Sequence, residues 1–408
     1  MWTVRATAYS SGDRGFNSGV VLNSSMGSDY VYHYRDIRAY NNGTTCNTGT
    51  PTHWCSGAGI DTSGNDWANN DVSRNFIIGA TLFGNWITAE GTYGGGYQEV
   101  WHATDYNNGG IGYSGTHALR AEAKNQLLFN SIDTFQGTTA GFSFEAATAD
   151  ASQPQHQFTP MVMNNCFRPR LSDSESLGAA DASAGWPGKG TYANPPSWIG
   201  STNKVGLTNC DPKFVSLDTT TFANNDFHLQ AGSTAIDTGR FLTLANGAGS
   251  SSTMITVKAN GGSADPRYYF IQPSSYLDAV ADTVQIKGAT CTNAATELGS
   301  AERAKITSMN ATQIFLDRIC TWPDGAGVHL PWNGNAPDMG AYEYSSTNCA
   351  FGDLDCSGAV DILDLQRLVN VLLGTETDSA VIARADLNGD GSATVQDLQL
   401  LVNKLLGV

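Results

Sequence analysis

The sequence predicts a mainly β protein in three parts. These are a right-handed parallel β-helix over about residues 1–240, a small β-rich elaboration over 241–345 and a small all-α domain over 349–408. Three observations support this prediction. Short apolar phrases recur in the first part, apolar and polar residues alternate in the second, and an acidic segment followed by a helical pattern occurs twice in the third.

One short phrase recurs through the first part, as "GIDTSG", "WITAEG", "GIGYSG" and "GFSFEA". Its second residues are spaced 27, 24 and 31 apart, and they are Ile60, Ile87, Ile111 and Phe142. This spacing fits a coil of about three short strands that stacks on the next coil at the ~4.8 Å spacing of neighbouring strands. Asn residues at the corners are expected to hydrogen-bond from coil to coil. The alternative is a β-sandwich or a β-propeller, which also separates short strands with turns.

The composition is typical of an exported protein that does not bind nucleic acid. Only 15% of the 408 residues are charged and the net charge is −16, whereas phosphate backbones require Lys and Arg. No apolar run approaches the ~20 residues of a membrane span. The opening stretch "WTVRATAYSSGDRG" has neither the basic nor the apolar region of a signal peptide, so we expect the amino end to be processed or incomplete.

The cysteines predict disulfide bonds, and therefore an extracellular location, because their number is even and no CxxC pair is present. The sequence leaves their connectivity open. Pairing neighbours in order gives the shortest loops, which join Cys46 to Cys55, Cys166 to Cys210, Cys291 to Cys320, and Cys349 to Cys356. The alternative is a set of free buried thiols in a cytosolic protein.

Two phrases carry a family resemblance, "DFHLQAGSTAIDTG" over 226–239 and "GVHLPWNGNAPDMGAYEY" over 327–344. They resemble the closing phrases of secreted bacterial right-handed parallel β-helix proteins, a group that includes polysaccharide lyases. The resemblance covers most of 30–345, and it implies a fold more than a chemistry. Between the phrases, segments such as "STMITVKANGG" alternate apolar and polar residues, which predicts a small β-barrel or β-sandwich that closes the β-helix.

The end of the chain contains two candidate calcium loops. A calcium loop of this type supplies oxygen ligands at positions 1, 3, 5, 7, 9 and 12, with glycine at position 6. The first loop places at these ligand positions Asp353, Asp355, Ser357, the Ala359 carbonyl, Asp361 and Asp364. The second places there Asp386, Asn388, Asp390, the Ser392 carbonyl, Thr394 and Asp397. Since Gly358 and Gly391 take position 6, the sequence predicts two Ca²⁺ sites.

Each loop leads into an amphipathic helical pattern, "DLQRLVNVLLG" or "DLQLLVNKLLG", and no helix is expected to enter either loop. This duplicated half-motif resembles a type I dockerin, the module that attaches secreted glycan-degrading enzymes to a cohesin on a scaffold or cell surface. Ser357 at position 5 departs from the expected carboxylate. Positions 10 and 11, which carry partner recognition in dockerins, are Ile362–Leu363 and Val395–Gln396 instead of hydroxyl pairs. The alternative is an acidic helical hairpin that only caps the chain.

Candidate catalytic residues follow from stacking the recurring phrases in register. The outward residues would then be Ser63, Glu90, Ser114 and Glu145. Glu90 and Glu145 would lie two coils apart, roughly 9–10 Å. That separation is near the upper end of the ~6.5–9.5 Å expected for an inverting glycosidase. The competing chemistry is β-elimination, for which His102 and Lys124 are candidate bases.

These observations favour an extracellular protein that acts on or binds a polysaccharide, as a lyase or a glycoside hydrolase, and is held on a cohesin-like partner by its tail. The sequence does not select between catalysis and binding. The alternative is a non-catalytic structural or adhesive subunit, in which β-helices stack end to end into a fibre.

Overall fold

The structure is a computed structural model that divides into two compact units, residues 1–343 and 344–408. Among the described residues, the first unit contains every strand, and the protein is mainly β with parallel sheets and few helices, as predicted. The described residues are 2–9, 16–17, 31–42, 58–63, 74–85, 88–93, 97–108, 117–121, 125–134, 142–144, 161–169, 171–178, 189–197, 199–217, 225–273, 280–345, 352–354, 360, 362–376, 379–387 and 392–406.

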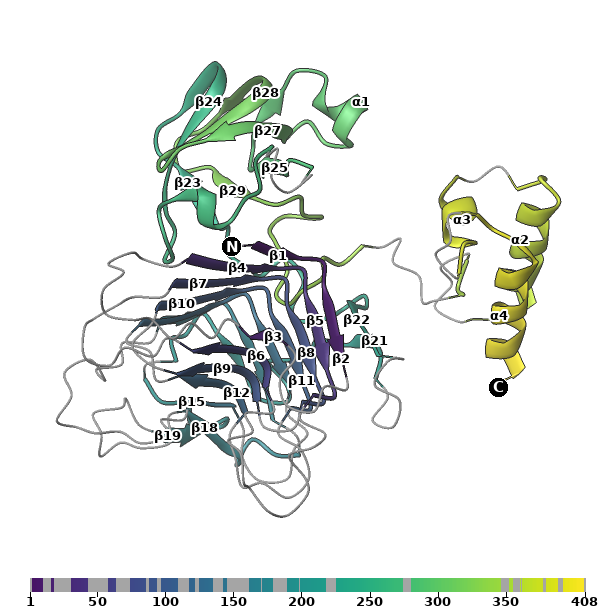
Figure 1. Cartoon of the computed structure of the whole chain (residues 1–408), viewed down its shortest axis with the longest axis horizontal. Coiled ribbons are helices and arrows are strands. Elements are labelled where there is room, and N and C mark those ends of the chain that lie inside the picture. The colour runs from purple at the N-terminus through teal and green to yellow at the C-terminus, as the bar shows by residue number, and fades with distance from the viewer. Residues whose placement is uncertain are drawn as a thin grey trace. The chain divides into compact units, whose positions relative to one another are not determined.

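Three parallel sheets form the body of the first unit (Figure 1). The first sheet has the order β1 (Trp2–Val4), β4 (Val31–Arg35), β7 (Arg74–Ile78), β10 (Tyr97–Trp101), β13 (Asn125–Phe129) and β16 (Met161–Met163). The second has the order β2 (Thr7–Tyr9), β5 (Arg38–Tyr40), β8 (Thr81–Phe83), β11 (Thr104–Tyr106), β14 (Ile132–Thr134), β17 (Cys166–Arg168) and β20 (Lys204–Val205). The third has the order β15 (Phe142–Phe144), β12 (His117–Ala121), β9 (Thr88–Tyr93), β6 (Ala58–Ser63) and β3 (Phe16–Asn17). From β1 to β15, successive strands join the three sheets in turn, which is the topology of a parallel β-helix.

The turn from the first sheet to the second places one residue of each coil at positive φ. These residues are Arg5, Asp36, Gly79, His102, Asn130 and Asn164. Gly, Asn and Asp adopt this left-handed region at lower cost than other residues, which explains why they occupy most of these corners. The corner lets each strand end after a few residues and start the next sheet.

A ladder of buried Asn side chains follows the second sheet. Asn42 Nδ2 donates to Asn85 Oδ1 at 2.9 Å, and Asn85 Nδ2 donates to Asn108 Oδ1 at 2.8 Å. At the other corner of the same sheet, Asn165 Nδ2 donates to Asn203 Oδ1 at 3.0 Å. The predicted hydrogen bonds between Asn residues of successive coils are therefore confirmed.

Asn85→Ala is expected to lower the free energy of unfolding of the body by about 3 kcal/mol, because buried groups of Asn42 and Asn108 each lose a hydrogen-bond partner. Urea unfolding followed by tryptophan fluorescence measures this change. Asn209→Ala is the control, since Asn209 is exposed and its truncation should cost no more than about 0.5 kcal/mol. Equal losses in the two variants would contradict a stabilising role for the ladder.

The first sheet packs apolar side chains on both of its faces. Tyr34, Ile77, Val100, Leu128 and Val162 stack in register and form part of the core inside the coils. The alternate positions of the same strands include Phe76, Trp101 and Phe129, which belong to a second core shared with residues beyond 241. The two faces differ because successive side chains of a strand point to opposite sides.

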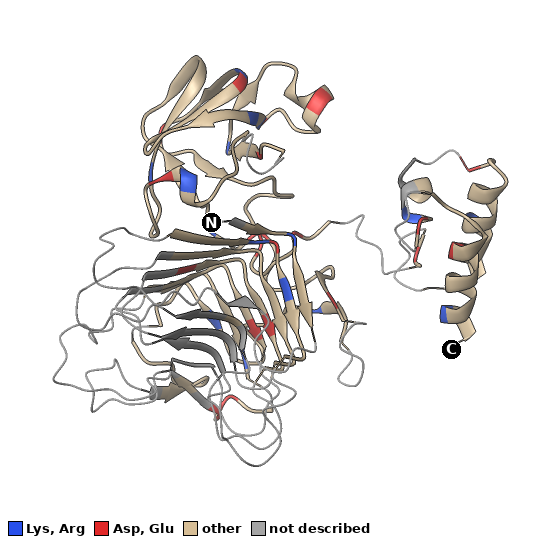
Figure 2. Cartoon of the chain, in the orientation of Figure 1, with Lys and Arg blue, Asp and Glu red and all other residues tan. Residues whose placement is uncertain are grey.

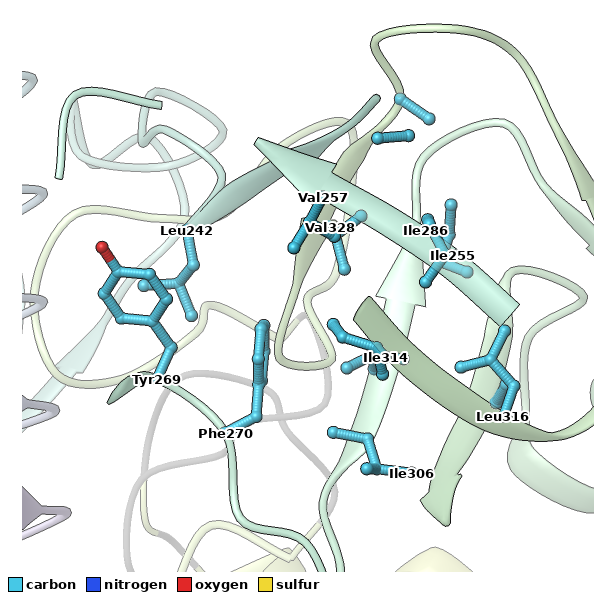
Figure 3. Close-up of a cluster of buried hydrophobic side chains, with 14 of the residues drawn as sticks. Leu242, Ile255, Val257, Tyr269, Phe270, Ile286, Ile306, Ile314, Leu316 and Val328 are labelled. Carbon is cyan, nitrogen blue, oxygen red and sulfur yellow. The ribbon is translucent and has the colours of Figure 1, made fainter. Parts of the chain in front are cut away.

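The second core is enclosed by an antiparallel sheet. Its strand order is β24 (Gly249–Ala259), β23 (Thr243–Ala245), β29 (Gly327–His329), β25 (Thr283–Ile286), β27 (Arg303–Met309), β28 (Gln313–Trp322) and β26 (Thr290–Cys291). Because β24 also pairs with β28, the sheet closes into a barrel with β26 at its edge. Figure 3 shows Ile255, Ile286, Ile314 and Leu316 directed into the same interior from β24, β25 and β28.

The remaining short elements of the first unit are the pair β18 (Ser176–Gly178) and β19 (Lys189–Thr191), the pair β21 (Phe214–Ser216) and β22 (Asp226–Leu229), the 3-10 helix Pro266–Tyr268 and helix α1 (Ala294–Leu298). Disulfides join Cys166 to Cys210 and Cys291 to Cys320, which confirms two of the predicted pairs. The other four cysteines, Cys46, Cys55, Cys349 and Cys356, lie outside the described residues.

The second unit consists of helices α2 (Ile362–Leu372), α3 (Ser379–Arg384) and α4 (Val395–Leu406). Leu368 of α2 and Leu401 of α4 are fully buried in its core, with Val381 of α3. The expectation that no helix enters the second loop was wrong, because α3 ends two residues before Asp386. Its six residues are too few to give a helical pattern, and contacts of Val381 and Ala385 with the rest of this core stabilise it.

Candidate functional site

The first candidate calcium loop is bounded by two buried carboxylates. Asp353 at position 1 is 1% exposed and Asp364 at position 12 is 0% exposed. The backbone N–H of Leu354 donates to Asp364 Oδ1 at 2.6 Å, which holds the two ends of the loop together. Asp364 lies in the first turn of α2, where the positive end of the helix dipole favours a carboxylate.

The second loop repeats this geometry. Asp397 at position 12 is fully buried in the first turn of α4, and its Oδ1 accepts the backbone N–H of Leu387 at 2.8 Å. Its Oδ2 accepts the backbone N–H of Thr394 at 2.7 Å and the Thr394 hydroxyl at 3.1 Å. The N–H at position 2 therefore donates to the carboxylate at position 12 in both loops.

These described positions fit a calcium ion. Buried carboxylates are costly unless a cation or several hydrogen bonds offset their charge, and calcium prefers hard oxygen ligands. Asp386 and Ser392 are also described, whereas the central ligand positions Asp355, Ser357, Ala359, Asp361, Asn388 and Asp390 lie outside the described residues. Within the described part of the chain, no group of three or more His, Cys, Asp or Glu could hold a metal ion.

The strand register differs from the one that suggested Glu90 and Glu145 as a catalytic pair. Ile60 of β6 pairs with Glu90 of β9, and Glu90 pairs with Leu119 of β12. Leu119 in turn pairs with Phe144 of β15. The predicted stacking of Ile60 over Ile87 was wrong. It rested on aligning phrases of similar sequence, whereas the register between strands depends on how side chains pack from coil to coil.

Of the two candidate bases, the structure describes His102 and not Lys124. Lys124 and Glu145 lie outside the described residues. His102 is described and buried at a corner of the coil, where its Nε2 lies 2.8 Å from Nε2 of His329 on β29 and 2.9 Å from Asn130 Nδ2. Burial lowers the pKa of His102 to about 4, so its ring is neutral at pH 7. This geometry gives His102 contacts with the barrel rather than with an open surface.

A second buried group at the same junction was not found from the sequence. Glu99 is 0% exposed and accepts hydrogen bonds from Trp101 Nε1, the Tyr269 hydroxyl and the backbone N–H of Ser263. Nearby, Arg35 donates to Asp282 at 3.1 Å. From the sequence, the alternation of Glu99 with apolar Val100 predicts that Glu99 faces solvent. No local pattern indicates that the barrel covers that face of the sheet.

The surface of the first unit also carries an accessible His–Asp pair that sequence reasoning missed. His228 Nδ1 lies 2.6 Å from Asp226 Oδ1 on β22, and the ring packs on Tyr342 with a centroid distance of 4.3 Å. Burial acts to raise the pKa of Asp226, but hydrogen bonds from His228 outweigh it and the pKa is lowered. A carboxylate that orients an imidazole in this way is suited to proton transfer.

The basic residues of the described part of the chain are scattered. Figure 2 shows Lys and Arg distributed singly over the described strands and helices rather than gathered on one face. No described helix has the length and apolar character needed to span a membrane.

Comparison with known proteins identifies the tail. Residues 351–406 match the family model of the dockerin type I domain. No curated protein matches the chain. A solved structure titled "Crystal structure of pectate lyase Pel9A" is similar over 84% of this chain, at 14% identity and a TM-score of 0.33, and the chain spans 51% of that structure's length. The chain therefore carries a type I dockerin domain at residues 351–406, as its sequence predicts.

Proposed function

We propose that this is an exported protein whose coiled body acts on a polysaccharide while its dockerin domain attaches it to a cohesin-like protein on a scaffold or cell surface. The dockerin domain is the observation that supports this most strongly, because dockerins exist to attach extracellular proteins to cohesins. The disulfides Cys166–Cys210 and Cys291–Cys320 support export, since such bonds persist in oxidising compartments. We also propose a right-handed coil, the hand favoured for parallel crossover connections.

In this proposal each dockerin loop binds one Ca²⁺. Asp353 and Asp364 hold the ends of the first loop, and Asp386 and Asp397 hold the ends of the second. When bound, the ion joins the two ends of a loop through their carboxylates. The exposed residues Ile362, Leu363 and Val395 then stand beside the loops, where dockerins contact their partners; their exposed fractions are 69%, 58% and 72%.

The attachment is tested by binding of the full chain to a panel of purified cohesins in calcium buffer. We expect at least one cohesin to bind, EDTA to abolish binding, and the double variant Ile362→Asp with Leu363→Asp to weaken binding at least tenfold without loss of helicity. Ile382→Asp is the matched control, because Ile382 is an exposed apolar residue on the separate helix α3. Failure of every cohesin to bind would contradict the attachment.

The action on polysaccharide is tested by product analysis on pectins, alginates and xylans. Unsaturated products that absorb in the ultraviolet indicate a lyase, and new reducing ends without them indicate a hydrolase. Glu90→Gln, Glu145→Gln and Lys124→Ala identify the catalytic groups, and unchanged turnover removes each from the proposal. If no glycan yields products and the protein forms ordered filaments, the structural-subunit alternative replaces the enzyme.

A further inference from the structure

Two aspartates lie on neighbouring strands of the second sheet, in register with core residues. The register runs from Ala39 through Leu82, Asp105 and Asp133 to Phe167. Ala39, Leu82 and Phe167 all belong to the hydrophobic core inside the coils. Since paired positions of a parallel sheet share one face, this register assigns Asp105 and Asp133 to the interior of the coil.

The flanking positions confirm this orientation. Thr81 donates its hydroxyl to the Tyr342 hydroxyl, and the Thr104 hydroxyl accepts the backbone N–H of Ala341. Residues 341 and 342 belong to the segment that follows the barrel, outside the coil, so Thr81 and Thr104 point outward. Asp105 follows Thr104 directly and therefore points inward.

The interior offers the carboxyl group of Asp133 little compensation for the loss of water. Asp105 is 5% exposed and Asp133 is 4% exposed, and Asp133 Oδ2 is buried without a hydrogen bond. Asp105 and Asp133 are directly paired in register, and neighbouring parallel strands are about 4.8 Å apart. Two adjacent carboxylates in a buried setting do not both ionise at low cost, and one pKa rises strongly. Burial raises the pKa of Asp133 to about 7.

We propose that Asp105 and Asp133 form a buried carboxyl pair that retains a proton in the folded coil, so that the pair stabilises the body most in acid and this stabilisation is lost as the proton leaves for solvent. The pair is a pH-sensitive element of the fold, separate from the glycan and cohesin contacts proposed above.

The described side chains that face the pair come from the first and second sheets. Leu82 and Phe167 lie above and below it on the second sheet, and Val100 and Leu128 face it from the first sheet. On the third sheet, the backbone of Glu90 pairs with that of Ile60 and with that of Leu119.

The sign of the pH effect follows from the raised pKa. An unfolded Asp133 releases its proton near pH 3.8, whereas the folded chain holds it to about pH 7. The stabilisation is therefore complete below pH 3.8 and is lost as the pH rises through about 7. Each unit of pKa difference between the folded and unfolded states changes the unfolding equilibrium constant tenfold. A difference of about three units therefore changes this constant about a thousandfold. The lowered pKa values of His102 and His329 act in the opposite direction, and they are the same in parent and variant.

The test is the full chain and its Asp133→Asn variant, unfolded in urea from pH 4 to pH 8.5 with tryptophan fluorescence as the signal. The ratio of the parent unfolding constant to that of the variant is expected to rise about a thousandfold across this range. Asp324→Asn makes the same chemical change at a side chain that is 68% exposed, and it should leave the ratio flat. A flat ratio for Asp133→Asn overturns the proposal. Glu90→Gln tests whether a residue of the third sheet causes the pH dependence instead. If the pH dependence of unfolding is lost in Glu90→Gln and kept in Asp133→Asn, the assignment to Asp133 is overturned.

A measurement that leaves Asp133 in place keeps the proposal testable if Asp133→Asn does not fold. With Glu343 replaced by Gln, because burial raises the pKa of Glu343 to about 8, the infrared spectrum at pH 6 is expected to contain the carbonyl stretch of a buried protonated carboxylic acid. This band should disappear by pH 9 while the protein is still folded. Absence of this band at pH 6 overturns the proposal.

Discussion

Excess EDTA is expected to unfold residues 351–406 of the full chain and to leave the first unit folded. The dockerin core is small, and the buried carboxylates Asp364 and Asp397 lose the cation that offsets their charge, so metal binding supplies much of the folding free energy. Two spectroscopic signals report on the two units separately, tryptophan fluorescence on the first and helical circular dichroism on the tail. All 9 tryptophans precede residue 344, whereas the long helices α2 and α4 lie in the tail. Far-ultraviolet circular dichroism should lose most of its helical signal while tryptophan fluorescence is unchanged.

Variants of one loop at a time measure how much each of the two calcium sites contributes to calcium binding. Asp397→Ala removes the position-12 ligand of the second loop and is expected to weaken calcium binding there on the order of a hundredfold or more. Titration calorimetry should then report one strong site in place of two. The matched control is Asp324→Asn, an exposed carboxylate of the first unit that should leave calcium binding unchanged. Helicity that survives EDTA in the unaltered chain would contradict the two calcium sites.

The second large effect is expected from Glu99→Ala. This change leaves the buried Trp101 Nε1–H, the Tyr269 hydroxyl and the Ser263 N–H without the acceptor that they share. Because each unpaired buried donor costs about 1–3 kcal/mol, we expect a loss of about 3–5 kcal/mol in the free energy of unfolding of the first unit. Urea unfolding followed by tryptophan fluorescence measures the loss.

Two further variants control this experiment. Glu99→Gln keeps one acceptor oxygen and should lose less than Glu99→Ala. Glu297→Ala removes a side chain that is 55% exposed and paired with Arg318, and it should cost less than about 1 kcal/mol. If Glu99→Ala costs no more than Glu297→Ala, the buried network does not stabilise the junction between the coil and the barrel.

The features that the sequence determined by itself are local or repeated. The duplicated loop pattern is enough to assign Asp353, Asp364 and Asp397 to the ends of loops, because calcium ligands follow fixed spacings along the chain. Asn residues at the corners were predicted as a class, because this residue type recurs where the backbone turns. The cysteine count predicted disulfides but left their connectivity open, and the structure then confirmed Cys166 with Cys210 and Cys291 with Cys320.

The tertiary structure alone decided which residues meet. Phrases of similar sequence did not stack in register, because loops of unequal length connect the coils and the fit of interior side chains sets the alignment, as the pairing of Ile60 with Glu90 illustrates. Burial was equally invisible along the chain. His102 lies against His329, a partner 227 residues away, and Asp133 faces the interior only because its strand is fixed between two others. Local patterns specify turns, ligand spacings and helices, whereas register and burial depend on contacts between distant segments.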